Sequence, residues 1–491
     1  MPRTIAESTP VNPAYRWVDV EPERQRFLKP LFDHFGSPTL RVWLESSVAE
    51  RGLDRAGCAG LVTATGACDG RRVAIAWSDF RVNAASYGRT NSRRFAAFLR
   101  QLDAEDDAIP LLYFVTSAGV SLMEGRTAFS DAFHLWPELL HFGERHPLLT
   151  CAAGKCLGLA PVLFALGHYR VAIVGETRIN LTGPEVIRLF FGEGVDFEAR
   201  AAAERCVERH DLIHELVPSV EGAVALFRAI LAARAGDELG AARSLGSKTR
   251  SVLLSLLDAA PLELVPGWCP RVRLFLGRRR GKPLGIFINP PDRSDNLITV
   301  RTLEKYAAGL DLFRALGLPI VSLLDSPGFD PRFEQSDASN IRQILRVGEK
   351  IMRYPHGTMG IVVGRCFGGS ASLGFPKIFG SRRVVALRGS TFGLMCTAIV
   401  ERLLRGSPRL WEEWKRTAQS QGPGLEDLVD EGSLDAVVEP GQLPAEVDRF
   451  LAGLDGGMWR PSAAPQRPGG TAGRPRRSHD AQILPLREAV S

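Results

Sequence analysis

The chain has few of the features from which several classes of protein are recognised. Its 491 residues include eight cysteines, spaced singly without a Cys-x-x-Cys pair, so neither a disulfide framework nor a zinc ribbon is indicated. No apolar run reaches the roughly 18 residues that a membrane helix needs. The first ten residues lack the apolar core of a signal peptide. We therefore expect a reduced protein in the cytoplasm, without a membrane partner.

Familiar catalytic signatures are also missing. No P-loop occurs, and the nearest string, at 240–249, has the wrong spacing and lacks the Gly-Lys pair. No Gly-x-Ser-x-Gly elbow is present, which disfavours a serine hydrolase. No pair of acid and base side chains stands out as a catalytic dyad.

The composition is that of a globular protein with a small excess of positive charge. Hydrophobic residues make up 45% and charged residues 24%, and the net charge is +6. The densest basic cluster is at 271–282. It is either a solvated strand edge or loop, or a contact for a polyanionic ligand such as a nucleotide phosphate. We expect no nucleic-acid partner.

The most informative feature present is an internal repeat. Three short segments of the first half return in the second half, in the same order and at nearly the same distance. The segment pairs are Gly154–Ala160 with Gly364–Ser370 (GKCLGLA and GRCFGGS, offset 210), Pro110–Gly119 with Pro319–Gly328 (offset 209), and Gly70–Ile75 with Gly281–Ile286 (offset 211). The repeat and the length predict two copies of one fold.

Each half has the pattern of an α/β domain, in which buried strands alternate with helices. In the first half we expect a hairpin over 61–80, a helix over 92–102, and a buried strand at 111–117. A strand at 146–153 should then lead into a turn at 154–158, a helix at 160–167, a strand at 170–175 and a turn at 181–187. In the second half the corresponding strands are expected at 281–289, 319–325, 358–364 and 382–389, with helices at 300–316 and 341–352.

The glycine turn that follows a buried strand in each half can stabilise an oxyanion, because backbone N–H groups point out of such a turn at the start of a helix. The donors would be Gly158 and Leu159 in the first copy, and Gly369 and Ser370 in the second. The strict 210-residue offset pairs Gly158 with Gly368 instead. Two alignments of the turns, which differ by one residue, therefore stay open. The alternative is that these glycines only permit tight packing of helix on strand.

A series of motifs resembles the carboxyltransferase (β) subunit of biotin-dependent acyl-CoA carboxylases of the propionyl-CoA carboxylase type. The motifs are, in order, SDFRVNAASYG, TSAGVSLMEG, AAGKCLGLA, INLTGPEVI, LLDSPGFDP, ILRVGEKIM, GRCFGGSAS and FGLM, and the resemblance covers about 61–454. It implies two tandem crotonase-like (ββα spiral) domains. The domain limits that we predict are an N-terminal arm at 1–30, an acyl-CoA-side domain at 31–262, a biotin-side domain at 263–455 and a disordered tail at 456–491.

The resemblance also implies roles for residues. The turn at Gly158 and Leu159 would bind the thioester oxygen of an acyl-CoA, and the turn at Gly369 and Ser370 the ureido oxygen of carboxybiotin. Other residues implied in acyl-CoA binding are Ser117, Ala118, Gly119, Thr182 and Gly183. Those implied in biotin binding are Phe367, Gly368, Pro327 and Gly328. No metal is expected in this chain.

The implied partners are a biotin carboxylase and a biotin carrier subunit. Because the chain has no Met-Lys-Met attachment sequence, the biotin should arrive on a separate chain. The family implies a homo-oligomer, either a dimer or a hexamer, or a hetero-oligomer with a related subunit. The acyl group and the direction of the reaction stay open.

Several positions depart from the family pattern. Ser121 replaces an arginine, Lys155 a proline, and Leu159 the second glycine of the first turn. We expect Leu159 to crowd the approach to the thioester side, since leucine does not easily adopt a positive φ. Two alternatives therefore stay beside the carboxylase: a decarboxylase or transcarboxylase subunit, and a non-catalytic structural paralogue that pairs with an active carboxyltransferase.

One cysteine and two histidines have a spacing that suggests a metal site, and three further histidines precede them in the sequence. Cys206, His210 and His214 would share one face of a continuous helix, but no fourth ligand is near in the sequence, so an ordinary helix face is favoured. The remaining group, His134, His141 and His146, is most simply explained as scattered polar positions beside a helix.

Overall fold

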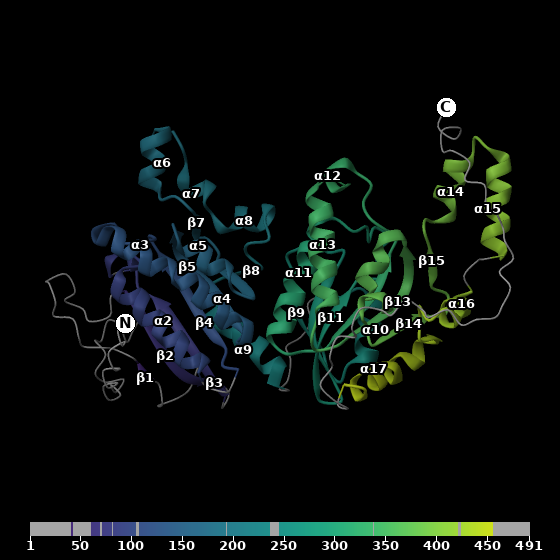
Figure 1. The fold of residues 1–491 in the computed structure, drawn as a ribbon, viewed down its shortest axis with the longest axis horizontal. Coiled ribbons are helices and arrows are strands. Elements are labelled where there is room, and N and C mark those ends of the chain that lie inside the picture. The colour runs from purple at the N-terminus through teal and green to yellow at the C-terminus, as the bar shows by residue number, and fades with distance from the viewer. Residues whose placement is uncertain are drawn as a thin grey trace, which may run out of the picture. The chain divides into compact units, whose positions relative to one another are not determined.

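The structure is a computed structural model that describes residues 41–42, 60–68, 71–80, 82–104, 108–192, 194–235, 245–336, 338–420 and 424–454. The predicted arm at 1–30 and the predicted tail at 456–491 lie outside the described residues. The chain divides into two compact units, residues 1–237 and 238–491. Each unit is an α/β domain with its own sheet (Figure 1).

The sheet of the first unit begins with an antiparallel hairpin and continues with parallel strands. Its order is β1-β2-β3-β4-β5-β6-β8, and β7 pairs with the end of β5. The strands are β1 (Arg41–Val42), β2 (Leu61–Cys68), β3 (Arg71–Ser78), β4 (Leu111–Ser117), β5 (Leu148–Leu157), β6 (Tyr169–Ile173), β7 (Arg178–Asn180) and β8 (Glu215–Val217). All seven residues of β4 are buried, as expected for a central parallel strand covered on both faces.

Several helices of the first unit cover this sheet because their apolar residues recur on one side. In α2, Phe95, Leu99 and Leu102 are buried, and they pack in one core with Leu139 and Phe142 of α4. The helices are α2 (Arg89–Asp103), α3 (Gly125–Phe133), α4 (Leu135–Arg145), α5 (Ala160–Ala165), α6 (Pro184–Phe191), α7 (Phe197–Arg200), α8 (Ala203–Arg209) and α9 (Val220–Ala235).

The second unit repeats the plan. Its sheet order is β16-β14-β13-β12-β11-β10-β9, with β15 paired to the end of β13. Its strands are β9 (Leu262–Leu264), β10 (Arg273–Arg279), β11 (Lys282–Ile288), β12 (Ile320–Ser326), β13 (Thr358–Phe367), β14 (Arg383–Leu387), β15 (Thr391–Gly393) and β16 (Ala436–Val438). Its helices are α10 (Ser247–Leu256), α11 (Val300–Ala315), α12 (Phe333–Ser336), α13 (Ala338–Met352), α14 (Thr397–Leu404), α15 (Pro408–Ser420), α16 (Leu425–Asp430) and α17 (Leu443–Ala452).

The two sheets match strand for strand, which confirms the predicted fold class and the duplication. Both contain a register shift at the same place, between Val115 and Ser117 in the first unit and between Leu324 and Ser326 in the second. Both also carry an isolated parallel bridge beside the shifted strand, Tyr87 with Val120 and Ile298 with Phe329. Such irregularities rarely recur by chance.

Three predicted boundaries were wrong. The expected turn at 154–158 is mostly strand, because β5 runs on to Leu157 and pairs with β7, and β13 likewise runs on to Phe367. The turn predicted at 181–187 contains the start of helix α6, which begins at Pro184, a favoured residue for a first helical turn.

The limit between the units lies 25 residues before the predicted position of 262. It falls after Asp237, within the stretch between the last helix of the first unit and β10. The physical reason is the packing of α10, whose Leu253 and Leu256 are buried in the core of the second unit with Val447 of α17.

Candidate functional site

The first glycine turn lies where β5 ends and α5 begins. Gly158 has φ +62°, a left-handed conformation that glycine adopts without strain. Its N–H donates to the carbonyl of Asn180 on β7 at 3.2 Å. The next two amides, of Leu159 and Ala160, stand at the N-terminus of α5, where N–H groups have no partner within the helix. Of the two donors predicted in this turn, Leu159 is therefore the better placed, since Gly158 is already engaged.

The leucine at the first turn does not crowd the site in the way that the sequence suggested. Leu159 has φ −73°, an ordinary helical value, and only 5% of its surface is exposed. Its side chain belongs to the hydrophobic core of the first unit, on which Val120 also packs. The change from glycine therefore adds a core side chain while the backbone N–H is kept.

The loop 117–119 lies directly against the first turn. The Ser117 hydroxyl donates to the carbonyl of Ala85 at 2.7 Å and accepts the N–H of Gly119 at 3.0 Å. A β carbon on Gly119, which has φ +103°, would lie 3.2 Å from the α carbon of Gly158. Ala118 between them is exposed. These contacts bring the three predicted acyl-CoA residues of this loop to the predicted thioester turn.

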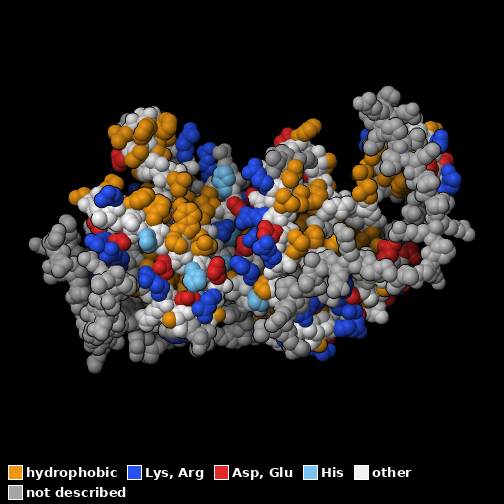
Figure 2. Space-filling model, viewed as in Figure 1, with side chains coloured by type: hydrophobic (Ala, Val, Ile, Leu, Met, Phe, Trp, Pro, Cys, Tyr) orange, Lys and Arg blue, Asp and Glu red, His pale blue; other side chains and the backbone are white. Residues whose placement is uncertain are grey.

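Thr182 and Gly183 reach the same turn through Asn180. The Asn180 side chain donates to the carbonyl of Thr182 at 2.7 Å, while its own carbonyl accepts the N–H of Gly158. Gly183 is the N-cap of α6. Side chains on α6 are apolar and exposed, among them Leu189 at 85% and Phe190 at 79%, and they form the hydrophobic cluster over α6 in Figure 2.

The second glycine turn settles the register of the repeat. Gly368 has φ +55° and follows β13, as Gly158 follows β5, so the strict offset of 210 is the structural one. Leu159 thus corresponds to Gly369, and Ala160 to Ser370. Gly369 is exposed, whereas Ser370 is buried and its hydroxyl donates to the carbonyl of Phe367 at 2.8 Å.

The loop beside the second turn is built like its counterpart. The hydroxyl of Ser326 donates to the carbonyl of Asn296 at 2.8 Å and accepts the N–H of Gly328 at 3.2 Å. A β carbon on Gly328 would lie 3.4 Å from the carbonyl oxygen of Phe367. Pro327, between Ser326 and Gly328, is half-buried. The predicted biotin residues of the two segments are thus brought together.

Phe329 explains why the second copy keeps the glycine that the first has lost. A β carbon on Gly369 would lie 2.4 Å from Cε2 of Phe329, which is closer than real contacts allow. The corresponding position in the first copy holds the smaller Val120, beside Leu159. The two pairs are complementary in size. The second copy combines the large ring of Phe329 with Gly369, and the first copy combines the smaller Val120 with Leu159.

Sequence analysis missed an ion pair that holds the second turn. The guanidinium of Arg365 donates to Oδ1 of Asp325 at 2.8 Å and to the carbonyl of Ser294 at 2.9 Å. The side chain of Asp325 is 9% exposed. The first copy has Thr116 and Lys155 at these positions, and there the Thr116 hydroxyl donates to the carbonyl of Lys155 at 3.2 Å. The signal in the sequence was the presence of opposite charges in two motifs of the second copy, Asp325 in LLDSPGFDP and Arg365 in GRCFGGSAS.

The cysteine within each turn motif is structural. Cys156 and Cys366 are both buried. Burial raises the pKa of the Cys156 thiol, and it raises the pKa of Cys366 to about 12. Both thiols are un-ionised near neutral pH, so neither is an activated nucleophile.

The proposed helix face of Cys206, His210 and His214 does not form. Helix α8 ends at Arg209, so His210 caps it and His214 lies beyond, 1% exposed, where Nδ1 accepts the N–H of Arg170 at 3.2 Å. Burial lowers the pKa of His214 well below its usual value, and nearby Arg170 lowers it further. This histidine is a neutral acceptor inside the domain.

The other three histidines lie around α4, as expected. His134 is the residue between α3 and α4, and His141 is an exposed position of α4. His146 is buried and differs from the simple interpretation, because its Nδ1 accepts the N–H of Ile109 at 3.0 Å. Among the residues that the structure describes, no group of three or more metal-ligating side chains occurs.

The basic cluster at 271–282 is a strand edge whose arginines are neutralised locally. Arg273 pairs with Glu263 at 2.5 Å, and Arg279 and Arg280 both pair with Asp448. The hydrogen bonds and the charge of Asp448 raise the pKa of Arg279. Of the two interpretations of this cluster, the packing favours the structural one.

A hollow of about 720 Å³ lies beside the first turn. Pro161 and Val162 of α5 line one side, and Asn180 with Leu181 another. The remaining wall contains mostly apolar residues and a cationic rim that includes Arg200 and Arg205. Because Asn180 also bonds Gly158, the hollow adjoins the amides at the start of α5.

Comparison with known proteins identifies relatives of the chain. Residues 39–238 match the family model described as the carboxyl transferase domain. A propionyl-CoA carboxylase beta chain of Saccharopolyspora erythraea is 24% identical over 444 residues, which cover 80% of this chain and 80% of that one. The chain is similar to carboxyl transferases over most of its length. The resemblance inferred from the motifs is thereby confirmed, as is the enzyme class.

Two further proteins are similar to this chain. A biotin-dependent acetyl-/propionyl-coenzyme A carboxylase beta6 subunit of Mycobacterium bovis is 23% identical over 380 residues, 71% of this chain and 80% of that one. The crystal structure of transcarboxylase 12S, a hexamer with methylmalonyl-coenzyme A and methylmalonic acid bound, has a TM-score of 0.76. It is 20% identical and covers 92% of this chain and 94% of its own. The structural likeness spans both units of the chain and shows a common fold.

None of the helices that the structure describes is both long and apolar enough to cross a membrane.

Proposed function

We propose that the chain is the carboxyltransferase subunit of an acyl-CoA carboxylase, which transfers a carboxyl group from carboxybiotin to the α carbon of an acyl-CoA. The observation that carries this proposal is the pair of equivalent strand-to-glycine turns after Leu157 and Phe367. Each offers backbone N–H groups at a helix start, where a developing oxyanion is best stabilised. The family match supports the same reaction class.

The first turn would bind the thioester oxygen. We assign the main donor to Leu159, assisted by Ala160 at the same helix start, and the loop with Gly119 positions the thioester against it. An enolate oxygen would gain most from such a donor, since removing one oxyanion-hole donor typically costs about 2.7 to 4 kcal/mol in a transition state. No side-chain base is required of the chain.

The second turn would bind the ureido oxygen of biotin through the amides of Gly369 and Ser370. The exposed Gly369 fits this role, because a side chain there would collide with Phe329 and cover the turn. When bound, carboxybiotin supplies the carboxyl carbon and a basic nitrogen. The residues of the chain hold the ureido group, and the Asp325–Arg365 pair keeps the turn in shape.

The hollow beside the first turn would receive the part of the acyl-CoA that does not react. Its apolar lining, including Val162 and Leu181, suits a hydrocarbon chain, and Arg200 and Arg205 at its rim suit phosphate groups. At about 720 Å³ it is larger than a two- or three-carbon acyl group needs, so we propose that the chain also takes longer acyl groups.

We further propose that biotin arrives on a carrier domain of another chain, next to a biotin carboxylase subunit, in the cytoplasm. The exposed apolar residues of α6, such as Phe190 and Phe191, and of α14, such as Leu403, are suited to contacts between copies. By family resemblance, copies assemble as a dimer or a hexamer, and each complete site combines a first turn with a second turn. The hexameric transcarboxylase 12S supports this assembly.

The test is turnover with a carboxylated biotin carrier. Purified chain, carrier and acyl-CoAs of increasing length should yield carboxylated products, detected by mass spectrometry. Gly369→Ala should lower the rate at least a hundredfold, and Phe329→Leu in the same chain should restore part of it. Gly406→Ala is the matched control, since an added β carbon there meets nothing within 4 Å. Unchanged turnover by Gly369→Ala would remove the biotin role of this turn.

The alternatives are separated by the same preparation. A decarboxylase or transcarboxylase would release or transfer carboxyl from a carboxylated acyl-CoA faster than it forms one. A structural paralogue would give no turnover in either direction while binding a second carboxyltransferase chain. Leu159 no longer supports that last alternative, because its side chain is in the core and its N–H is kept.

A further inference from the structure

A turn in the first unit, between β3 and α2, contains three consecutive residues in the left-handed conformation. Asn83, Ala84 and Ala85 have φ values of +49°, +50° and +48°. Asparagine tolerates this conformation, but alanine is strained in it because its β carbon lies too close to the following carbonyl oxygen. A run of strained residues persists only where the surrounding structure fixes it, and such residues gather at functional sites.

The backbone before β2 fixes this turn from one side. The N–H of Asp79 donates to the carbonyl of Gly60 at 2.8 Å, and the N–H of Val82 donates to the carbonyl of Asp79 at 3.1 Å. A β carbon on Gly60 would lie 2.8 Å from the carbonyl oxygen of Val82 and 3.1 Å from the α carbon of Ala85. The turn therefore has no room to relax toward Gly60.

On its other side the turn holds the loop 117–119, which contains three of the predicted acyl-CoA residues. The carbonyl of Ala84 accepts the N–H of Ala118 at 3.0 Å. The carbonyl of Ala85 accepts the hydroxyl of Ser117 at 2.7 Å. Two successive carbonyls of the turn thus hold two successive residues of the loop.

The same loop lies against the first glycine turn. The Ser117 hydroxyl accepts the N–H of Gly119 at 3.0 Å, and a β carbon on Gly119 would lie 3.2 Å from the α carbon of Gly158. Leu159, to which we assign the main oxyanion donor, follows directly. Only the loop therefore separates the left-handed turn from the proposed thioester site.

The second unit has the corresponding loop without a left-handed turn. Its Ser326 hydroxyl donates to the carbonyl of Asn296, as that of Ser117 donates to Ala85, so Asn296 corresponds to Ala85. Neither Asn296 nor Asp295 before it has a positive φ.

The two units differ because the partner of Ala84 differs. Pro327 occupies the position of Ala118 and has no N–H to donate. The carbonyl of Asp295, the counterpart of Ala84, instead accepts Nε of Arg271 at 2.9 Å. The left-handed conformation thus occurs in the unit whose loop offers an N–H at this position.

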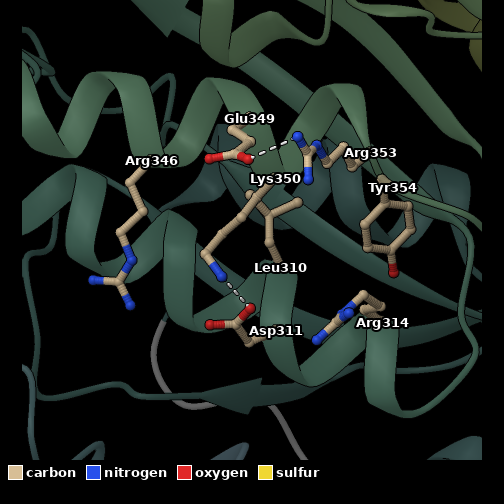
Figure 3. A pocket seen from close by; sticks show the side chains of 8 residues that line it. All are labelled: Leu310, Asp311, Arg314, Arg346, Glu349, Lys350, Arg353 and Tyr354. Carbon is tan, nitrogen blue, oxygen red and sulfur yellow. Dashed lines mark hydrogen bonds and ion pairs between the residues drawn. The ribbon is translucent and has the colours of Figure 1, made fainter. Parts of the chain in front are cut away.

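The turn holds the loop through its main chain and not through its side chains. Elsewhere a side-chain ion pair joins two elements, as Figure 3 shows for Asp311 of α11 and Lys350 of α13. Ala84 and Ala85 have only methyl side chains. The position of the loop therefore depends on the φ values of the turn.

We propose that Ala84 is a positioning residue of the carboxyltransferase site. The left-handed turn 83–85 holds the loop 117–119 where the thioester of an acyl-CoA meets the amide of Leu159. This role rests on the proposed function of the first glycine turn. Ala84 acts through Ala118 rather than on the reacting atoms, and its strain is the cost of directing its carbonyl to the loop.

The experiment replaces Ala84 by residues that differ in their tolerance of a positive φ. A β-branched residue rarely adopts it, so Ala84→Val should displace the turn. Amide hydrogen exchange at 117–121 should become about tenfold faster, the effect of one lost hydrogen bond. The kcat/KM for the acyl-CoA that the unmodified chain carboxylates fastest should fall about as much, while the KM for the carboxylated biotin carrier stays the same. Ala84→Asn, which tolerates the conformation, should recover most of both losses.

A second variant breaks the same hydrogen bond from the loop. Ala118→Pro removes the N–H donor, and Pro327 indicates that the matched backbone accepts proline. It should lower kcat/KM for the acyl-CoA as Ala84→Val does. The control is Ala104→Val, at an exposed residue with φ −73°, which should change neither quantity.

The outcomes separate this role from the proposed function. Unchanged exchange at 117–121 in Ala84→Val would overturn the positioning role. An equal fall of kcat/KM for acyl-CoA and carrier, in step with the melting temperature, would also overturn it, because a purely structural turn predicts that result. If the unmodified chain gave no turnover, the proposed function would fail, and the exchange rates would still decide whether the turn holds the loop.

Discussion

A β carbon added to Gly158 would lie 3.0 Å from the α carbon of Gly119, so the backbones of two separate loops touch at this point. The contact joins the end of β5 to the loop after β4. It fixes the predicted thioester turn relative to its neighbour without any side chain.

Gly158→Ala should therefore be more damaging than an ordinary glycine substitution. The positive φ costs about 1 to 2 kcal/mol for a residue with a side chain, and the contact with Gly119 adds an overpacking cost of about 1 to 3 kcal/mol. Gly175→Ala is the control, because Gly175 has φ +77° and nothing within 4 Å of an added β carbon. Urea unfolding of both variants measures the difference. If both variants lost the same free energy of unfolding, the contact with Gly119 would make no contribution to the cost of Gly158→Ala.

Leu159→Gly, which restores the glycine of the family pattern, should destabilise the protein and should not raise activity. Leu159 is buried, and removing a buried leucine side chain costs about 2 to 5 kcal/mol. If size complementarity is the reason for the change, Val120→Phe in the same chain should recover part of the loss, since Phe329 fills the corresponding place in the second copy. Thermal unfolding of the single and double variants gives the coupling free energy between positions 120 and 159. Additive effects would contradict the size argument.

Asp325→Asn should loosen the second turn selectively. The pair with Arg365 is partly buried, at 9% and 30% exposure, so we expect a loss of about 1 to 3 kcal/mol, reduced by screening at the more exposed partner. Carboxyl transfer from the biotin carrier should fall more than acyl-CoA affinity. Arg388→Gln is the control, because that side chain is 57% exposed and its ion pairs are on the surface. A larger loss in the control would contradict the assigned role.

His214 should make stability fall in mild acid. The folded domain keeps this histidine neutral because burial lowers its pKa, whereas in the unfolded chain the pKa is about 6.5. Below that pH the unfolded state binds a proton that the folded state does not, so stability present above about pH 6.5 is lost by up to about 1.4 kcal/mol per pH unit as pH falls. His214→Gln should flatten this slope between pH 6.5 and 5, measured by urea unfolding. The unmodified chain, unfolded in the same buffers, is the reference for the slope.

The fold and the position of the two glycine turns could be predicted because the repeat placed two buried strands before two glycine-containing segments. Boundaries failed where pairing partners decide the structure: Gly154 to Leu157 look like a turn in sequence but are held as strand by β7. The orientation of Leu159 could not be predicted, since it depends on which side of α5 faces the core. The Asp325–Arg365 pair was missed because its members are 40 residues apart and only the parallel pairing of β12 and β13 brings them together.

The donors assigned to both turns are main-chain amides, and this affects how such an enzyme can evolve. A side-chain nucleophile or base is lost by one substitution, but a backbone N–H persists with any residue except proline, provided that the φ value of the preceding position is kept. Gly158 and Gly368 are those positions. A chain only 24% identical to a propionyl-CoA carboxylase beta chain can therefore retain the geometry. Under the proposed function, the left-handed glycine that follows β5 or β13 therefore matters more to the turn than the identity of the residue that carries the donor.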